Sequence, residues 1–446
     1  MPTPATAAPT PTPAERARTR AAVIYGSAGT VVEWFDYGLY LYLVPVMSPL
    51  FFPSDDALIS AIASLGVFAA GSIMRIAGGA FFGSIGDRLG RKRALVLSIL
   101  MMTAPMALTA FLPTYVAIGI GAPLLFTGMR LLQGFSAGGE YSGTVVQLVE
   151  QAPTGRRGFI ASTAVFTSGI GIILASALVA GLTTWTSSEF MSDWGWRICY
   201  LVGGALGLFA LVMRRRMPET EEFVEEEKAG DVPKKPLRYA LRHLPKQVLV
   251  AALLAGYGGI LYYVVLGFVP TILDSFSEIQ SDEALWVVTG MTIIYAIATP
   301  AFGWLSDRYG RTRTLLAGAI GFLILSLPML WLMTHEGLLV VMAGGLVLLV
   351  LLMLYTGPVV AAIGEQFPSR ARYSALAVGY NLGTAILGGT APLIAALLIE
   401  WFDSPVASGL LLVVASAIAI PLLWRMRDRR HMSMEEINAE FAAVNR

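Results

Sequence analysis

Residues 83–91 read Gly-Ser-Ile-Gly-Asp-Arg-Leu-Gly-Arg, and residues 303–311 read Gly-Trp-Leu-Ser-Asp-Arg-Tyr-Gly-Arg. The second copy begins 220 residues after the first. Another pair of segments matches at nearly the same offset: residues 150–157 read Glu-Gln-Ala-Pro-Thr-Gly-Arg-Arg, and residues 365–372 read Glu-Gln-Phe-Pro-Ser-Arg-Ala-Arg. Two separate matches at one offset indicate that the chain consists of two homologous halves in parallel orientation.

The composition is too apolar for a soluble protein. Of the 446 residues, 56% are apolar and 14% are charged, and the mean hydropathy is +0.67, whereas a soluble domain has roughly 25% charged residues. The 31 basic and 30 acidic residues nearly cancel, so the net charge gives no indication of nucleic-acid binding. We therefore expect an integral membrane protein in contact with the lipid bilayer.

Several kinds of site are excluded by the residues that the chain lacks. Cys199 is the single cysteine, so neither an intramolecular disulfide nor a cysteine-based zinc or iron–sulfur site can form. The three histidines are scattered, so we expect no histidine metal site, and no phosphate-binding G-x-x-x-x-G-K-[ST] segment indicates ATP-driven pumping. With no nucleophile–base pattern either, we expect no metal, no cofactor and no enzyme activity.

Apolar runs of the length that crosses a bilayer recur along the whole chain. They predict an all-α integral membrane fold of twelve spans, near residues 22–50, 57–85, 94–113, 116–149, 158–184, 195–213, 247–274, 284–305, 314–334, 337–363, 373–399 and 405–424. The spans form two six-helix halves in pseudo-twofold arrangement, residues 21–213 and 247–424. Residues 1–20 are expected to be a disordered tail, 214–246 a polar linker with partial helix, and 425–446 a tail with a short surface helix.

The basic residues are segregated along the chain. Of the 31 Lys and Arg, 28 lie in the tails, the linker and alternate loops, while the opposite loops carry acidic residues instead. The positive-inside rule then places both termini in the cytoplasm, in a multi-pass protein of the cytoplasmic membrane that we expect to be a monomer. The other three are Arg75, Arg130 and Arg197, of which Arg197 lies beside Trp194 and Trp196 as an interface anchor.

The repeated loop has a readable physical role. Gly90 and Gly310 permit a tight turn between two helices, while Asp87 and Asp307 end a span where they can pair with arginine or cap a helix. Such charge pairs can hold the cytoplasmic side shut; the alternative is that they only fix topology. The predicted cytoplasmic gate comprises Asp87, Arg88, Arg91, Arg157, Asp307, Arg308, Arg311 and Arg372.

Charges inside the spans are expensive, by at least ~2.5 kcal/mol each, and so are expected to have a task. Asp36 and Tyr37 follow Glu33 at i+3 and i+4 on one helix face. We predict that Glu33, Asp36 and Glu140 couple transport to protons, and that Arg75 and Arg130 pair with these acids in the empty state. A purely structural role for the buried pairs is the alternative.

The second half has no comparable charge within its spans and offers aromatic and amide side chains instead. Tyrosine rings can pack an apolar or cationic end of a ligand, including by cation–π contact, although ordinary helix packing is the alternative for each ring. The predicted substrate-binding residues are Arg75, Arg130, Gln133, Tyr37, Tyr141, Tyr262, Tyr263, Tyr380 and Asn381.

The two copies of G-x-x-x-D-R-x-G-R resemble the major facilitator superfamily. Further motifs resemble its metabolite:proton symporter family: Val-Glu-Trp-Phe-Asp-Tyr at 32–37, Met-Arg at 74–75, Arg-Leu-Leu-Gln-Gly-Phe-Ser-Ala-Gly-Gly-Glu-Tyr at 130–141, Trp-Gly-Trp-Arg at 194–197 and Pro-Glu-Thr-Glu at 218–221. The segments at 139–143, 262–263 and 372–377 are similar to the proline/betaine branch. The family's osmosensing member has a long C-terminal coiled coil, which the short tail from Arg425 does not match.

We therefore expect a proton-coupled secondary active symporter that imports a small organic solute by alternating access. The solute is a carboxylate or zwitterion such as proline/betaine, 2-oxoglutarate or citrate. A substrate carboxylate would compete for an arginine, and the released, desolvated acid would take up a proton that crosses with the solute. An exchanger or exporter of organic anions, or a non-transporting sensor on the same scaffold, remains the alternative.

Overall fold

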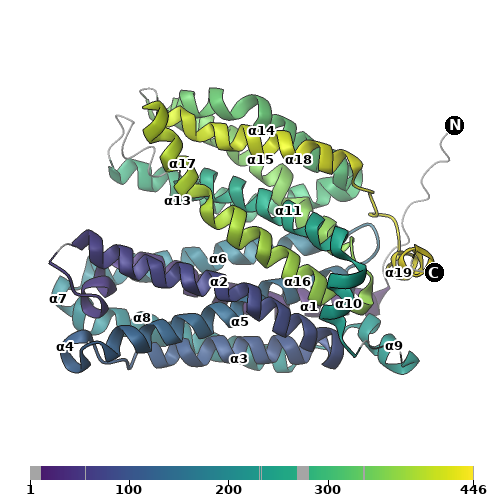
Figure 1. Cartoon of the computed structure of the whole chain (residues 1–446), viewed down its shortest axis with the longest axis horizontal. Coiled ribbons are helices and arrows are strands. Elements are labelled where there is room, and N and C mark those ends of the chain that lie inside the picture. The colour runs from purple at the N-terminus through teal and green to yellow at the C-terminus, as the bar shows by residue number, and fades with distance from the viewer. Residues whose placement is uncertain are drawn as a thin grey trace.

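The computed structural model describes residues 12–55, 57–230, 232, 234–268, 281–334 and 337–444, and within these ranges the chain forms helices and no β-strand. Figure 1 shows two helix bundles, one from each half of the chain. The long helices of the first are α1 (Pro13–Phe51), α2 (Ala57–Leu89), α3 (Arg91–Thr109), α5 (Gly121–Gln151), α6 (Arg157–Trp185) and α8 (Trp196–Arg215).

The second bundle repeats this arrangement. Its long helices are α11 (Pro245–Tyr262), α13 (Ser281–Tyr309), α14 (Arg311–Met333), α15 (Leu338–Gly364), α16 (Arg372–Gly383) with its continuation through η4 (Thr384–Gly388) into α17 (Gly389–Phe402), and α18 (Gly409–Arg425). The predicted twelve spans are thereby confirmed. Among the described residues, nine helices meet a length and hydropathy criterion for crossing a membrane. The three long helices outside that set are α1, α5 and α13.

Short helices connect the long ones. They are α4 (Tyr115–Ile118), α7 (Ser188–Phe190), η1 (Met191–Gly195), α9 (Glu221–Ala229), α10 (Pro236–His243), η2 (Tyr263–Phe268), η3 (Ser369–Ala371), η5 (Pro405–Ser408) and α19 (Met434–Val444). Helices α9, α10 and α19 lie at one end of the two bundles, on the right in Figure 1. We call this the repeat-loop end, because both copies of the repeated loop lie there: Arg91 donates its backbone N–H to Glu219 beside α9, and Arg311 donates its backbone N–H to Asp428 before α19.

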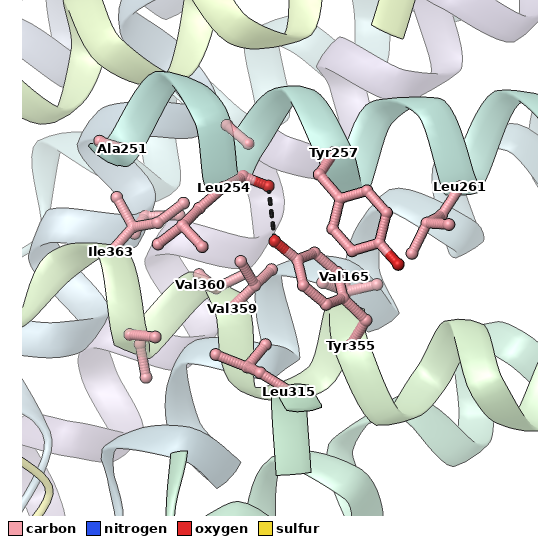
Figure 2. Close-up of a cluster of buried hydrophobic side chains, with 14 of the residues drawn as sticks. Val165, Ala251, Leu254, Tyr257, Leu261, Leu315, Tyr355, Val359, Val360 and Ile363 are labelled. Carbon is pink, nitrogen blue, oxygen red and sulfur yellow. Dashed lines mark hydrogen bonds between the residues drawn. The ribbon is translucent and has the colours of Figure 1, made fainter. Parts of the chain in front are cut away.

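The core of the second half extends to the first half. Figure 2 shows Val165 of α6 beside Tyr355, Val359 and Val360 of α15. A buried tyrosine hydroxyl needs a hydrogen-bond partner in an apolar surrounding. Accordingly, the Tyr355 hydroxyl donates to the Leu254 carbonyl over 2.8 Å, and the Tyr257 hydroxyl lies 2.7 Å from Ser416 Oγ. These two hydrogen bonds connect α11 to α15 and to α18, and so they fix the positions of these three helices in the second bundle.

The glycines of the repeated loop act as predicted. Gly90 and Gly310 have φ values of 103° and 116°, which side chains with a Cβ rarely adopt. The first glycine of each copy, Gly83 or Gly303, lies where helices from the two halves approach closely. A Cβ at Gly83 would come within 2.7 Å of the Ser374 Cα, and one at Gly303 would meet the Gly158 carbonyl. Each motif copy therefore lies at a contact between the halves, the first at α2 with α16 and the second at α13 with α6.

Two boundary predictions were wrong. The tail was expected to be disordered through residue 20, but α1 begins at Pro13, because proline suits a first helical position and Thr19 donates a 2.6 Å hydrogen bond to the Gln151 carbonyl. Residues 1–11 of that tail lie outside the described residues. The linker was expected to begin at residue 214, but Arg214 belongs to α8 and is fully buried. The predicted helix in the C-terminal tail is confirmed as α19, with Ile437 buried.

Candidate functional site

A cavity of about 450 Å³ lies between the two halves, and eight aromatic rings line part of its wall. Rings from both halves contribute to it: Trp34, Tyr37, Phe68, Tyr141, Tyr262, Tyr263, Tyr295 and Tyr380. Trp34 lies at the centre of this group, with ring centroids 6.1 Å from Tyr37, 6.5 Å from Tyr141 and 6.0 Å from Tyr262. Tyr141 of α5 stacks on Tyr380 of α16 at 5.0 Å, so the two halves meet through aromatic faces.

Arg75 is the one cation among the described residues that line this cavity. Its Nη2 lies 2.9 Å from the Glu33 Oε1, its Nη1 donates to the Tyr37 hydroxyl over 2.9 Å, and its Nε donates to the Asn381 Oδ1 over 3.2 Å. The guanidinium is thus held by α1 of its own half and by α16 of the other half. Because Arg75 binds side chains of both halves, its contacts depend on how the halves are placed relative to one another.

Glu33 is the partner of Arg75 and is completely buried. Besides the ion pair at 2.9 Å, neither of its carboxylate oxygens accepts a well-aligned hydrogen bond in the described structure. A buried carboxylate depends on such contacts for its charge, because leaving it unpaired in an apolar site is very costly. The charge of Glu33 therefore depends chiefly on Arg75.

A second ion pair, between Asp36 and Arg130, lies outside the set of side chains that line the cavity. The Arg130 Nη1 is 3.0 Å from the Asp36 Oδ2, and Gln133 donates to the Asp36 Oδ1 over 2.9 Å. Arg130 also donates to the Tyr200 hydroxyl over 2.5 Å and stacks 4.1 Å from the ring centroid of Tyr40. The sequence placed Arg130 and Gln133 in the binding site, but their side chains tie α1, α5 and α8 together.

A third pair joins Glu140 of α5 to Arg214 of α8, and both side chains are fully buried. Ser98 of α3 donates to the Glu140 Oε2 over 2.7 Å. Sequence reasoning missed Arg214, because it is the first of three consecutive arginines and was counted with the linker. Nothing in the sequence separates Arg214 from Arg215 and Arg216; only the direction in which α8 presents each side chain does.

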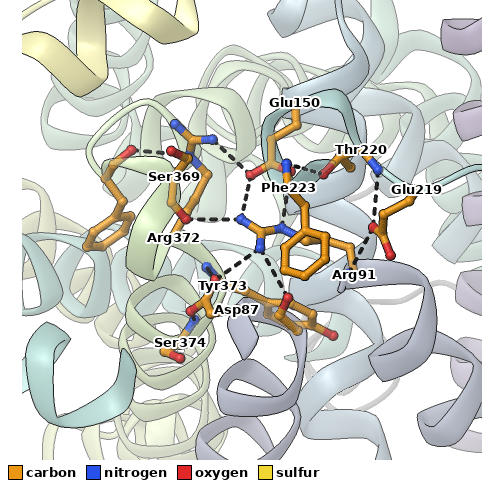
Figure 3. Close-up of polar contacts among 12 residues, drawn as sticks. Asp87, Arg91, Glu150, Glu219, Thr220, Phe223, Ser369, Arg372, Tyr373 and Ser374 are labelled. Atoms are coloured by element: carbon orange, nitrogen blue, oxygen red, sulfur yellow. Dashed lines mark hydrogen bonds and ion pairs between the residues drawn. The ribbon is translucent and has the colours of Figure 1, made fainter. Parts of the chain in front are cut away.

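The repeat-loop end carries a buried network of charges that links the halves (Figure 3). Asp87 accepts hydrogen bonds from the backbone N–H groups of Tyr373 (3.2 Å) and Ser374 (2.8 Å), so it caps the start of α16. Arg91 lies 3.6 Å from Asp87 and 3.1 Å from Glu150, and Arg372 lies 2.9 Å from the same Glu150 oxygen. Glu150 thereby joins an arginine of each half.

The second copy of the motif forms the equivalent contacts in the other half. Asp307 accepts from the N–H groups of Gly158 and Phe159, both at 2.9 Å, and so caps α6. Glu365 then lies 3.2 Å from Arg311 and 3.9 Å from Arg157.

The symmetry extends to the helices that follow each motif. Glu219 accepts from the N–H of Arg91 over 2.9 Å at the start of α3, and Asp428 accepts from the N–H of Arg311 over 3.0 Å at the start of α14. The internal repeat of the sequence therefore corresponds to repeated contacts in the structure. Each half contributes two carboxylates that cap helices and one carboxylate, Glu150 or Glu365, that lies between two arginines.

A model of the "Major Facilitator Superfamily" matches residues 26–278 and 259–442 of the chain. The chain belongs to the major facilitator superfamily. It is 30% identical over 412 residues to the "Proline/betaine transporter" of Escherichia coli K12, which covers 90% of this chain and 82% of that relative. It is 32% identical over 392 residues to the "Glycine betaine/proline/ectoine/pipecolic acid transporter OusA" of Dickeya dadantii, covering 86% and 78% of the two chains.

Solved structures of the superfamily share this fold. The proton:xylose symporter XylE bound to 6-bromo-6-deoxy-D-glucose superposes with a TM-score of 0.78 at 18% identity, covering 96% of this chain and all of that one. The predicted superfamily and fold are thereby confirmed. Because the curated relatives are named as transporters, this major facilitator is a multi-pass membrane transporter and not an enzyme.

Three further site predictions for this major facilitator need correction. Arg88 and Arg308 were assigned to the gate but are exposed and lie outside the buried network, since they occupy the outer face of their turns. Asn381 was expected in the cavity wall but is fully buried behind it, where its amide donates to the Gly138 carbonyl over 2.8 Å.

Other functional candidates were not chosen from the sequence. They are Trp34, Phe68 and Tyr295 in the cavity, Tyr200 beside Arg130, Arg214, and the network acids Glu150, Glu219, Glu365 and Asp428. The one available signal was the repeat of Glu-Gln-x-Pro at 150–153 and 365–368, which places Glu150 and Glu365 at equivalent positions.

Proposed function

We propose that the protein is a proton-coupled symporter that imports a small zwitterion with one carboxylate and a secondary or quaternary ammonium group, of the kind that the names of its relatives describe. The observation that carries this proposal is the Arg75–Glu33 pair at the wall of an aromatic cavity. A guanidinium can grip a carboxylate through two parallel hydrogen bonds. Aromatic faces attract a cation that cannot be satisfied by hydrogen bonding.

The proposed coupling follows from the geometry of the pair. In the empty protein Arg75 compensates the charge of Glu33. The substrate carboxylate replaces Glu33 at the guanidinium, and its ammonium end lies among Trp34, Tyr262 and Tyr380. Glu33 then remains buried without its partner, and it takes up a proton because burial disfavours the ionised form. Substrate binding and proton binding are thus mutually dependent.

The proposed substrate class follows from the number of charged side chains that line the cavity. Because Arg75 is the one cation among the described lining residues, the cavity can compensate one carboxylate. A second or third carboxylate, as in 2-oxoglutarate or citrate, would lie against aromatic rings with no cation to balance it, at a high desolvation cost. We therefore infer a preference for zwitterions such as glycine betaine and proline over dicarboxylates and tricarboxylates.

Uptake into proteoliposomes tests the proposed function. With the outside one pH unit more acidic than the inside, we expect labelled glycine betaine or proline to accumulate about tenfold, since one pH unit is worth ~1.36 kcal/mol for each proton moved. Excess unlabelled citrate or 2-oxoglutarate should not compete. Uptake of equal extent with and without the pH gradient would contradict symport. Acidification of the medium when solute is added would indicate exchange of solute for protons.

We further propose that the buried network at the repeat-loop end is the cytoplasmic gate. Each half caps a helix of the other through an aspartate, Asp87 on α16 and Asp307 on α6. Opening this end requires both caps to be released, so the loss of either cap lowers the free energy that opening costs. With both caps formed we expect this end to be closed, so that the cavity exchanges with the opposite side of the membrane in this state.

Removing one cap is expected to open the gate. Asp87→Ala loses two charge-assisted hydrogen bonds to backbone N–H groups, each worth ~1.5–3 kcal/mol. In a Cys199→Ala background with Ser142→Cys as reporter beneath the gate, a hydrophilic thiol reagent should label the variant at least about tenfold faster, because Ser142 is fully buried in the closed state. Asp193→Ala, an exposed aspartate outside the network, is the control. Equal labelling of the Asp87 variant and the control would refute the gate.

A further inference from the structure

A buried polar cluster lies on the side of Glu33 that faces the repeat-loop end. It is formed by Glu140 and Arg214, which we call the inner pair. The Arg214 Nη2 donates to the Glu140 Oε1, to the Gly26 carbonyl over 3.1 Å and to the Thr144 Oγ1 over 3.0 Å. Both side chains of the pair are fully buried, and neither lines the central cavity.

The inner pair is adjacent to Glu33 along α1. A Cβ at Gly29 would overlap both the Glu140 carboxylate and the Arg214 guanidinium, so the absent side chain of Gly29 provides the space that they occupy. Gly29 precedes Glu33 by one helical turn, roughly 6 Å along the axis. Glu33 and Glu140 are therefore neighbours in the buried interior of the first half. Proton transfer between the two acids would use a rotation of one carboxyl side chain or a bridging water.

Several polar atoms of Glu33 and Arg214 make no hydrogen bond within the described residues. The Arg214 Nε and Nη1 donate no hydrogen bond, and neither Glu33 oxygen accepts a well-aligned one. An unmet buried donor or acceptor costs ~1–3 kcal/mol, and a bridging water or a proton on Glu33 would offset part of that cost. The charged or titratable groups that face Glu140 are Arg214 from α8, Glu33 from α1 and Tyr373 from α16.

The inner pair lies between Glu33 and the repeat-loop end. Glu140 is 11 residues from the end of α5 at Gln151, roughly 16 Å from the repeat-loop end by helix rise. Arg214 is the second-last residue of α8, and its side chain reaches back from that end into the bundle. The inner pair therefore lies between the cavity-side acid and the end of the molecule where the proposed gate opens.

We propose that Glu140 is a second proton-carrying residue, through which the proton taken up at Glu33 leaves toward the repeat-loop end, and that Arg214 is its positioning residue. This inference rests on the proposed function. In the transfer step the Glu33 carboxylic acid gives its proton to the Glu140 carboxylate, so Glu33 is again an anion and can recover Arg75. The Glu140 carboxylic acid no longer balances Arg214, and its proton passes to water when the repeat-loop end opens.

The test separates proton release from substrate translocation. Glu140→Gln, and Glu140→Gln with Arg214→Gln to keep the buried charge balanced, are compared with the full-length wild type in proteoliposomes. Glycine betaine is the probe, and three quantities are measured: its dissociation constant, its counterflow between equal solute pools, and its accumulation under a pH gradient. Thr103→Val is the control, since it removes a hydrogen bond from the same helix, α3, to the Ile99 carbonyl and leaves the contacts of Glu140 and Arg214 in place.

The expected result is a split between these quantities. Binding within about threefold of wild type and retained counterflow, with gradient-driven accumulation reduced at least about tenfold in both variants, would support the second proton site. Accumulation equal to wild type in both variants would overturn it, and so would joint loss of binding, counterflow and accumulation, which is the signature of a packing role. If the wild type itself fails to accumulate glycine betaine under the gradient, it is the proposed function that fails.

Discussion

Arg75→Ala is expected to raise the dissociation constant for glycine betaine or proline by about 100-fold or more. Truncating one member of a buried, hydrogen-bonded charge pair typically costs 2–5 kcal/mol of binding free energy, and each 1.4 kcal/mol is a factor of ten. Arg75 has this role because its guanidinium faces the cavity and already holds a carboxylate, that of Glu33. Isothermal titration of the purified protein measures the change directly.

Two variants make the Arg75 prediction specific. Arg75→Lys keeps the charge but loses the planar fork, so we expect an intermediate loss of about tenfold. The charge-neutral double variant Asp36→Asn with Arg130→Gln removes the pair outside the cavity, and its affinity should stay within about threefold of wild type. Wild-type affinity of Arg75→Ala together with lost binding by the double variant would show that Arg130, and not Arg75, holds the carboxylate.

Glu33→Gln is expected to uncouple the transporter. The neutral amide imitates the protonated acid, so substrate binding should no longer depend on proton uptake. In the wild type, binding takes up a proton, and affinity therefore rises as the pH falls. In Glu33→Gln, affinity should be at least as high as in the wild type and independent of pH, whereas accumulation under a pH gradient should fall at least about tenfold. Counterflow should persist, since it needs no net proton movement.

The matched control for Glu33→Gln is Asp36→Asn, which neutralises an acid one turn along the same helix. Asp36 is bound by Arg130 and Gln133 outside the cavity wall. Its replacement should leave the pH dependence of binding in place, whatever its effect on stability. A pH-dependent Glu33→Gln variant with a pH-independent Asp36→Asn variant would transfer the proton-carrying role from Glu33 to Asp36.

The sequence predicted which charged side chains lie within the helices, because a single helix determines that property. Glu33, Arg75, Arg130 and Glu140 were identifiable because a charge within an apolar run has a free-energy cost that needs a reason. The turn glycines Gly90 and Gly310 were identifiable from the repeat, because a tight turn between two helices favours a residue without a Cβ.

The pairing of these charges was not predictable from their spacing. Glu33 and Asp36 are three residues apart on α1, yet the first binds Arg75 of α2 and the second binds Arg130 of α5. Which arginine meets which acid depends on how α2 and α5 are rotated against α1, and that rotation follows from close packing of small residues over the whole interface. For the same reason the cavity wall includes Trp34 but excludes Asn381.

Arg214 shows the same limit at a helix end. A run of three arginines after an apolar span is the usual mark of a membrane boundary, and two of the three are indeed exposed. The first turns inward because Glu140 and the Gly26 carbonyl lie within reach of its guanidinium. No property of residues 214–216 themselves contains that information.

The most direct test of the account is the number of protons that the purified protein takes up when substrate binds. The central claim is that a substrate carboxylate displaces Glu33 from Arg75 and leaves Glu33 to be protonated. A pH indicator in weakly buffered detergent solution should report uptake of roughly one proton for each glycine betaine bound to the wild type, and none for Glu33→Gln at saturating ligand. Saturated binding without proton uptake by the wild type, or equal uptake by both proteins, would contradict the claim.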